Sequence, residues 1–85
     1  MIEITELTMD GTVKEYTVPE NTHSLALHII GADVDMKTSA ISDKWTIKDG
    51  EKESIDARTI SNEKIYFTGP TGAKVQIRRL TGLLS

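Results

Sequence analysis

The sequence of 85 residues contains no cysteine, which excludes disulfide bonds and thiolate metal sites of the zinc-finger kind. This absence also suits a reducing cytoplasm. Apolar runs are short, so no segment has the length that a membrane-spanning helix needs, and no membrane partner is expected. The first residues carry no basic charge ahead of an apolar stretch, and we therefore expect no signal peptide.

The chain is short enough that residues 1–85 form one small domain, and oligomerisation is a common way for such a domain to gain stability. Its net charge of −3 is unevenly spread, because residues 1–56 carry twelve acids against five bases, whereas residues 57–85 carry one acid against five bases. This distribution allows the two parts to complement each other in charge, either within one fold or between neighbouring subunits. It lacks the concentrated basic face that nucleic-acid binding requires, so no nucleic-acid partner is expected.

Apolar and polar residues alternate along the chain with a period of two, which indicates strands rather than helices. The alternating segments centre on residues 2–4, 12–18, 23–30, 34–36, 44–48, 55–58, 64–68 and 74–78. Turn dipeptides such as Asp10-Gly11 and Asp49-Gly50 separate several of them. The pattern predicts an all-β fold, a two-sheet antiparallel sandwich of jelly-roll or Greek-key type with about eight short strands. At residues 38–40, a loop and a single helical turn are both open.

The predicted core consists of the apolar members of these segments. They are Ile2, Ile4, Val18, Leu25, Leu27, Ile29, Val34, Trp45, Ile47, Ile55, Ile65, Phe67, Val75 and Ile77. Trp45 is the only tryptophan, and we expect it to pack in the core, where its large area contributes most. An exposed Trp45 would instead favour a sugar-binding module.

Two segments resemble each other, residues 16–31 (YTVPENTHSLALHIIG) and residues 66–82 (YFTGPTGAKVQIRRLTG). Two interpretations are open. The segments are two related strand–turn–strand units in a sandwich, or they are alike only because few residue types suit hairpin turns. The second segment contains Gly69, Gly72 and Lys74, but its spacing departs from that of a phosphate-binding P-loop at three points. We therefore interpret it as a proline–glycine corner between two strands.

No cofactor and no metal ligand is predicted. His23 and His28 are the only histidines, and their spacing of five sends them to opposite faces of a strand. Asp33 and Asp35 form a D-x-D pair, but Lys37 stands where a calcium loop would continue with Asp or Asn. A solvated strand face is the expected role of this pair.

No catalytic residue is predicted, and we expect that the protein is not an enzyme. Glu51 and Glu53 occupy a charged hairpin tip, which lacks the cleft that a glycosidase carboxylate pair needs. A nucleophile elbow of the G-x-S-x-G kind is absent. A hydrolytic enzyme is the least favoured interpretation, and it would need a pocket that holds His23 or His28 beside Asp or Ser.

The closing stretch QIRRLTGLLS supplies candidate contact residues. Arg78 and Arg79 would place one guanidinium on each face of a strand, and Leu83 and Leu84 form an apolar tail. The tail packs on its own core, or it docks on a neighbour while an arginine pairs with an acid of that neighbour. The interface candidates are Arg78, Arg79, Leu83, Leu84, Asp33 and Asp35.

The stretches EYTVPENTHSLALHIIG and IYFTGPTGAKVQIRRLTG resemble the strand–turn–strand phrasing of small jelly-roll-like structural proteins of tailed bacteriophages, such as decoration, neck and tail accessory proteins. The resemblance implies a non-enzymatic virion protein that associates with itself, as a trimer in many cases, and with other virion proteins. It would be found in the virion or, during assembly, in the host cytoplasm. The family shares no catalytic residues, and residues 31–42 depart from its pattern as a weak strand.

The alternative function is a small carbohydrate-binding or adhesin module. Such modules stack sugar rings on exposed aromatic faces. This alternative predicts that Trp45 or Tyr66 is exposed on the face of a sheet.

Overall fold

The computed structural model describes residues 2–38, 43–60 and 62–81. Over these residues the chain forms strands and no helix, which confirms the all-β prediction. The strands are β1 (Ile2–Thr8), β2 (Lys14–Thr17), β3 (Thr22–Ile30), β4 (Val34–Lys37), β5 (Trp45–Ile47), β6 (Lys52–Asp56), β7 (Lys64–Thr68) and β8 (Lys74–Thr81). The choice between a loop and a helical turn at residues 39–40 lies outside the described residues.

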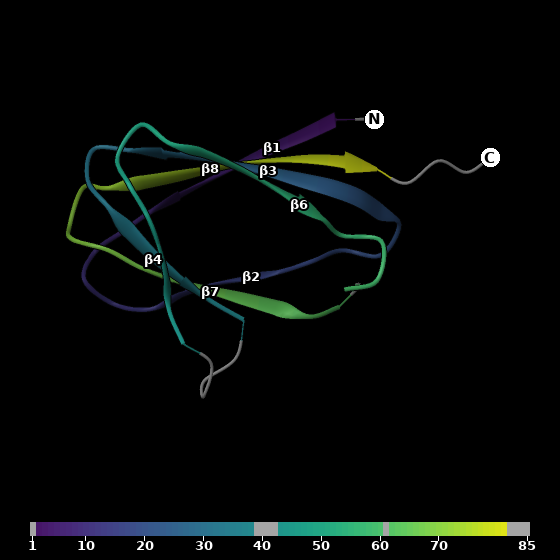
Figure 1. Ribbon diagram of the computed structural model, residues 1–85, viewed down its shortest axis with the longest axis horizontal. Coiled ribbons are helices and arrows are strands. Elements are labelled where there is room, and N and C mark those ends of the chain that lie inside the picture. Colours follow the sequence, from purple (N-terminus) through teal and green to yellow (C-terminus); the bar gives the residue numbers. More distant parts are fainter. Residues whose placement is uncertain (1, 39–42, 61, 82–85) are drawn as a thin grey trace.

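The strands form two antiparallel four-stranded sheets, which Figure 1 shows as two layers. Sheet A has the order β1-β8-β3-β6, and sheet B has the order β2-β7-β4-β5. Strand β1 therefore pairs with β8, β2 with β7, β3 with β6, and β4 with β5. This is the order that results when one long hairpin is rolled up, and it identifies the sandwich as a jelly roll.

The two similar stretches of sequence occupy equivalent places in this topology. Strand β2 leads through the first proline turn into β3, and β7 leads through the second into β8. Both connections pass from sheet B to sheet A. Because β2 pairs with β7 and β3 pairs with β8, the two units lie side by side and run in opposite directions.

The core lies between the two sheets. Its buried apolar residues are Met9, Val18, Leu25, Leu27, Ile29, Val34, Ile47, Ala57, Ile65, Phe67, Ala73, Val75 and Ile77. Most of them were predicted, because the inward residues of β3, β7 and β8 follow the alternation. Met9 was not, since it stands beside a turn dipeptide. Its backbone N–H nonetheless donates to the carbonyl of Ala73 at 2.7 Å, which extends the β1–β8 pairing inward and buries the side chain.

The core prediction is wrong for Ile2 and Ile4, which are 60% and 72% exposed. Leu7 of the same strand pairs with the buried Val75 and packs against the core. Side chains on a strand alternate between two faces, so β1 cannot bury Leu7 together with Ile2 and Ile4. The register that places Leu7 inside turns the two isoleucines outward.

The corner between β7 and β8 forms as predicted. Its carbonyl at Pro70 accepts the N–H of Ala73 at 3.1 Å, and Gly72 adopts a φ of +95°, which favours glycine. A Cβ on Gly69 would lie 3.1 Å from side-chain carbons of both Met9 and Val34, so a larger residue would strain the core here. The segment thus joins two strands, whereas a P-loop joins a strand to a helix.

Candidate functional site

The outer face of sheet A, which points away from sheet B, carries an exposed apolar patch. Ile2 is paired with Leu80, and Ile4 is paired with Arg78. These side chains belong to the outward set of β1 and β8, and Ile2, Ile4 and Leu80 are all exposed. We call Ile2, Ile4 and Leu80 the apolar patch.

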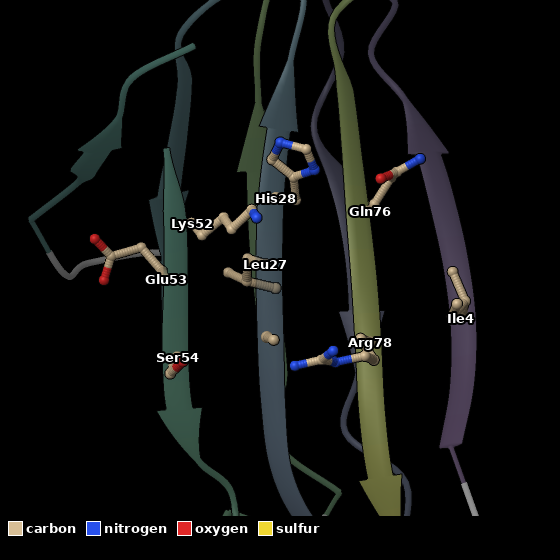
Figure 2. A pocket seen from close by; sticks show the side chains of 9 residues that line it. Ile4, Leu27, His28, Lys52, Glu53, Ser54, Gln76 and Arg78 are labelled. Carbon is tan, nitrogen blue, oxygen red and sulfur yellow. The ribbon is translucent and has the colours of Figure 1, made fainter. Parts of the chain in front are cut away.

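A shallow hollow of about 320 Å³ opens beside the apolar patch, over β3 (Figure 2). A second hollow of about 290 Å³ shares Ala26, Ser54 and Arg78 with the first and extends to Ile2 and Leu80. The two hollows together form one depression, which we call the β3 groove. The middle of the groove is recessed because Ala26 and Ser54, which face each other on β3 and β6, have short side chains.

Three nitrogen-bearing side chains surround the β3 groove. Figure 2 shows the guanidinium of Arg78 extending from β8 toward β3, and the ammonium of Lys52 extending toward β3 from β6 on the other side. The imidazole of His28 rises from β3 itself. Three neighbouring strands therefore direct hydrogen-bond donors into one small volume.

The positive charges of the groove have no ion-pair partners among the described residues. Neither Arg78 nor Lys52 lies within ion-pair distance of a carboxylate of residues 2–38, 43–60 or 62–81. Most other basic residues of this part of the chain are paired. The paired ones are Lys14, Lys44, Arg58, Lys64, Lys74 and Arg79. Two of the four basic residues without an ion pair in this part of the chain, Arg78 and Lys52, thus border one groove of a protein whose net charge is negative.

Carboxylates lie around the groove, and two of them, those of Asp56 and Glu6, accept hydrogen bonds from other side chains. Arg58 donates hydrogen bonds to both carboxylate oxygens of Asp56, and these bonds lower the pKa of Asp56 to about 2. Gln76 donates to Glu6 at 3.1 Å. Glu53, which follows Lys52, also borders the hollow but points away from it in Figure 2. The positive region is therefore small and bounded by negative charge.

Arg79 differs sharply from its neighbour Arg78. It points between the sheets, where its side chain is 11% exposed. Its guanidinium donates to the hydroxyl of Thr22 at 2.7 Å, to the carbonyl of Glu20 at 2.8 Å and to the carboxylate of Glu3 at 2.6 Å. The prediction that the two arginines take opposite faces is confirmed, and Arg79 is satisfied within its own chain.

Asp33 and Asp35 also bond within their own chain. Asp33 accepts the N–H of Asp49 at 2.9 Å, and Asp35 accepts the hydroxyl of Thr46 at 2.7 Å and pairs with Lys44 at 3.5 Å. Among the described residues no group of three side chains could hold a metal ion. Leu83 and Leu84 lie outside the described residues. Of the interface candidates in the described ranges, Arg78 alone has a side chain with neither a hydrogen bond nor an ion pair to the described residues.

The two histidines do not form a common site. His28 lies on the outer face of sheet A, while His23 lies near the start of β3, where the pairing with β8 has an irregularity between Thr22 and Ser24. His28 and Ser54 border the same hollow, as a hydrolase would require. In the part of the chain that the structure describes, however, no hydrogen bond joins their side chains.

Trp45 was expected in the core but is 60% exposed. It begins β5, a three-residue strand at the edge of sheet B, and pairs with Met36, which is only partly buried. Ile47, on the same side of β5, is fully buried. Of the two inward residues of β5, only Ile47 reaches the core. The indole of Trp45 lies where sheet A does not cover it.

No protein family, curated protein or solved structure matches this chain. Within residues 2–38, 43–60 and 62–81 there is no helix with the length and apolar character required to cross a membrane.

The cluster of His28, Lys52 and Arg78 was not predicted from the sequence. Its members are far apart in the chain and meet because β3 pairs with both β6 and β8. Alternation does place His28 on the face opposite Leu27, and it assigns Arg78 to the face opposite Ile77. Which strands adjoin is set by the rolled-up topology, and no local sequence pattern specifies it.

Proposed function

We propose that this protein is a non-enzymatic structural protein that associates with copies of itself, and that it serves as an accessory component of a tailed-phage particle. The resemblance of its two strand–turn–strand units to structural proteins of tailed phages suggests that the particle is that of a tailed phage. Its partners would be copies of itself and other virion proteins, in the virion or in the bacterial cytoplasm during assembly.

The observation that carries this proposal is the apolar patch on the outer face of sheet A. Ile2, Ile4 and Leu80 project from two paired strands into solvent. Covering an aliphatic side chain of this size contributes roughly 1.5–3 kcal/mol when burial is complete. Grouped apolar side chains on an outer sheet face are typical of contact surfaces, whereas scattered ones are not.

Sedimentation velocity over a range of concentrations tests self-association. We expect the wild-type protein to exceed its monomer mass as concentration rises, and the limiting mass gives the number of copies. Ile4→Glu places a charge in the apolar patch and should hold the protein at the monomer mass. Val13→Glu is the matched control, because Val13 is 58% exposed and lies outside the patch. A wild-type protein that stays monomeric at every concentration would refute self-association.

Genes for capsid or tail proteins beside the gene of this protein would support the particle role. The direct check is mass spectrometry of purified particles from such a phage. The protein should be present at a fixed ratio to the major capsid or tail protein. Its absence from intact particles would contradict the role.

The exposure of Trp45 favours a second candidate, a carbohydrate-binding module. A flat indole open to solvent offers the surface on which a pyranose ring stacks. Titration with glycans should then change the fluorescence of Trp45, and Trp45→Ala should abolish binding. Tyr66, half-buried on β7, serves as the control: Tyr66→Phe should leave glycan binding unchanged. A glycan panel that leaves the fluorescence unaltered would remove this candidate.

A further inference from the structure

We infer that the β3 groove binds a short extended segment of a partner protein that carries acidic and apolar side chains. The inference rests on the proposed function in one respect, since the groove lies on the face that we assign to assembly. It adds the chemistry of the partner segment and the residues of this chain that recognise it.

The charge of the occupant follows from the three strands around the groove. Arg78 and Lys52 reach toward β3 from opposite sides, and neither has a carboxylate partner among the described residues. A guanidinium binds a carboxylate through two parallel hydrogen bonds, and an ammonium and an imidazole can add further donors. An occupant with carboxylates would supply the partners that the fold does not.

The size of the occupant follows from the strand geometry. From Ser24 to His28, the stretch of β3 beneath the groove spans about 13 Å, which is the length of four or five extended residues. The backbones of Arg78 and Lys52 are separated by about two strand spacings across the sheet and one two-residue step along it, so an extended segment that lies along β3 passes between them. Two acidic side chains, on either side of an extended segment, fit this separation.

The apolar patch determines the rest of the chemistry. Ile4 borders the first hollow, and Ile2 and Leu80 border the second. A segment that places its carboxylates over Arg78 and Lys52 would bring its other side chains against these three residues. Apolar side chains are therefore expected between the acids of the partner.

The same surroundings disfavour a densely charged polymer. Glu53, which has no ion pair among the described residues, borders the first hollow beside Lys52, so a chain with a negative charge on every unit would meet a like charge there. None of the described residues that border the hollows is a phenylalanine, tyrosine or tryptophan, on which a neutral or acidic sugar ring would stack. An acidic and apolar peptide is the occupant that meets both conditions.

An NMR titration of ¹⁵N-labelled protein tests the inference. The probe is the peptide Asp-Leu-Glu-Leu-Asp with blocked ends, and its amide counterpart Asn-Leu-Gln-Leu-Asn is the matched control. We expect the acidic peptide to shift the amide signals of Ala26, His28, Ser54 and Arg78, and the amide peptide to shift none. Arg78→Ala should weaken binding about tenfold, as the loss of a bidentate ion pair does. Lys52→Ala should weaken it as well.

Lys37→Ala is the control variant, because Lys37 lies on sheet B and is also without an ion pair among the described residues. It should bind the acidic peptide as the wild type does. Tetragalacturonate, a short acidic sugar, forms a separate arm. Binding of the sugar without binding of the peptide would overturn the assignment to a peptide. Equal binding of the amide peptide, or no shift with acidic peptide up to about 5 mM, would overturn it too.

The inference and the proposed function can fail separately. Sedimentation that shows self-association, together with no peptide binding by the wild-type protein at a concentration at which sedimentation finds it monomeric, removes only the inference. A wild-type monomer that binds the acidic peptide through Arg78 removes only self-association.

Discussion

The guanidinium of Arg79 lies 2.6 Å from the carboxylate of Glu3, and this ion pair joins two adjacent strands, β8 and β1, on the inner side of sheet A. The same guanidinium donates to the hydroxyl of Thr22, which is buried and in turn donates to the carbonyl of Pro19 at 2.7 Å. Burial raises the pKa of the nearby Tyr16 hydroxyl, although the charge of Arg79 acts in the opposite direction. Arg79 thus links sheet A to the β2–β3 turn.

Arg79→Ala is expected to destabilise the protein by about 2 kcal/mol, because it removes three hydrogen-bond donors from groups that are partly buried. Urea unfolding followed by circular dichroism measures the change. Arg78→Ala is the matched control, since Arg78 is exposed and unpaired among the described residues. The control should change the free energy of unfolding by no more than about 0.5 kcal/mol. Equal effects of the two substitutions would contradict the assignment of different roles.

Gly69→Ala is expected to destabilise the protein by about 1–3 kcal/mol, the range for overpacking a filled core. The added methyl would lie 3.1 Å from both Met9 and Val34, which are fully buried. Thr71→Ala, one position beyond Pro70 and exposed, is the control and should be nearly neutral. Thermal unfolding of the three proteins provides the comparison. A Gly69→Ala protein as stable as the wild type would show that the corner has more room than its geometry implies.

Asp56 contributes to stability in a way that depends on pH. Its pKa is lowered to about 2, chiefly by hydrogen bonds from Arg58. The unfolded value lies near 4, so the contribution is present above about pH 4 and is lost as the pH falls toward 2. Asp56→Asn should therefore be less stable than the wild type at about pH 5, and the difference should vanish near pH 2. The effect is small, because both partners are exposed and salt screens them.

Melting temperatures of the wild type and Asp56→Asn between about pH 2 and 5 check this expectation. A difference that stayed constant across this range would contradict it. Asp10 should behave in the same direction, since hydrogen bonds from Thr12 and Lys14 lower the pKa of its carboxyl as well.

The exposure of Trp45 gives a spectroscopic prediction. Acrylamide, a neutral quencher, should reduce the fluorescence of the folded protein almost as efficiently as that of the urea-unfolded chain, because Trp45 is the only indole. Trp45→Phe should leave the free energy of unfolding within about 0.5 kcal/mol of the wild-type value. Strong protection from acrylamide would place the indole inside the core after all.

The sequence was sufficient to predict the fold class and a segment that overlaps each strand, because a period of two together with turn residues is a local signal. Strand β6 was placed too late in the chain, since it begins at Lys52 and includes Glu53, which was expected in a charged hairpin tip. The inward residues of β3 and β8 were identified correctly for the same reason. Ile2 and Ile4 were wrongly assigned to the core, because alternation shows that a strand has two faces but does not show which face packs against the other sheet. Only the pairing of Leu7 with Val75 decides that, and it depends on the register between the two ends of the chain.

The β3 groove depends even more on non-local pairing. Arg78 was chosen as a contact residue from its place in the sequence, but its neighbours Lys52 and His28 were not, since three separate strands bring them together. The depth of the groove comes from Ala26 and Ser54, whose small size matters only because they face each other. Such a site becomes visible once the order of the strands is known.

The absence of cysteine permits the most direct test of the claim that the outer face of sheet A is a contact surface. Ile4→Cys introduces a single thiol in the apolar patch, and Val13→Cys introduces one at an exposed position away from it. The rate at which a maleimide reagent modifies each thiol is measured as protein concentration increases. We predict that the rate falls with concentration for Ile4→Cys and stays constant for Val13→Cys. Equal, concentration-independent rates for the two variants would contradict the account.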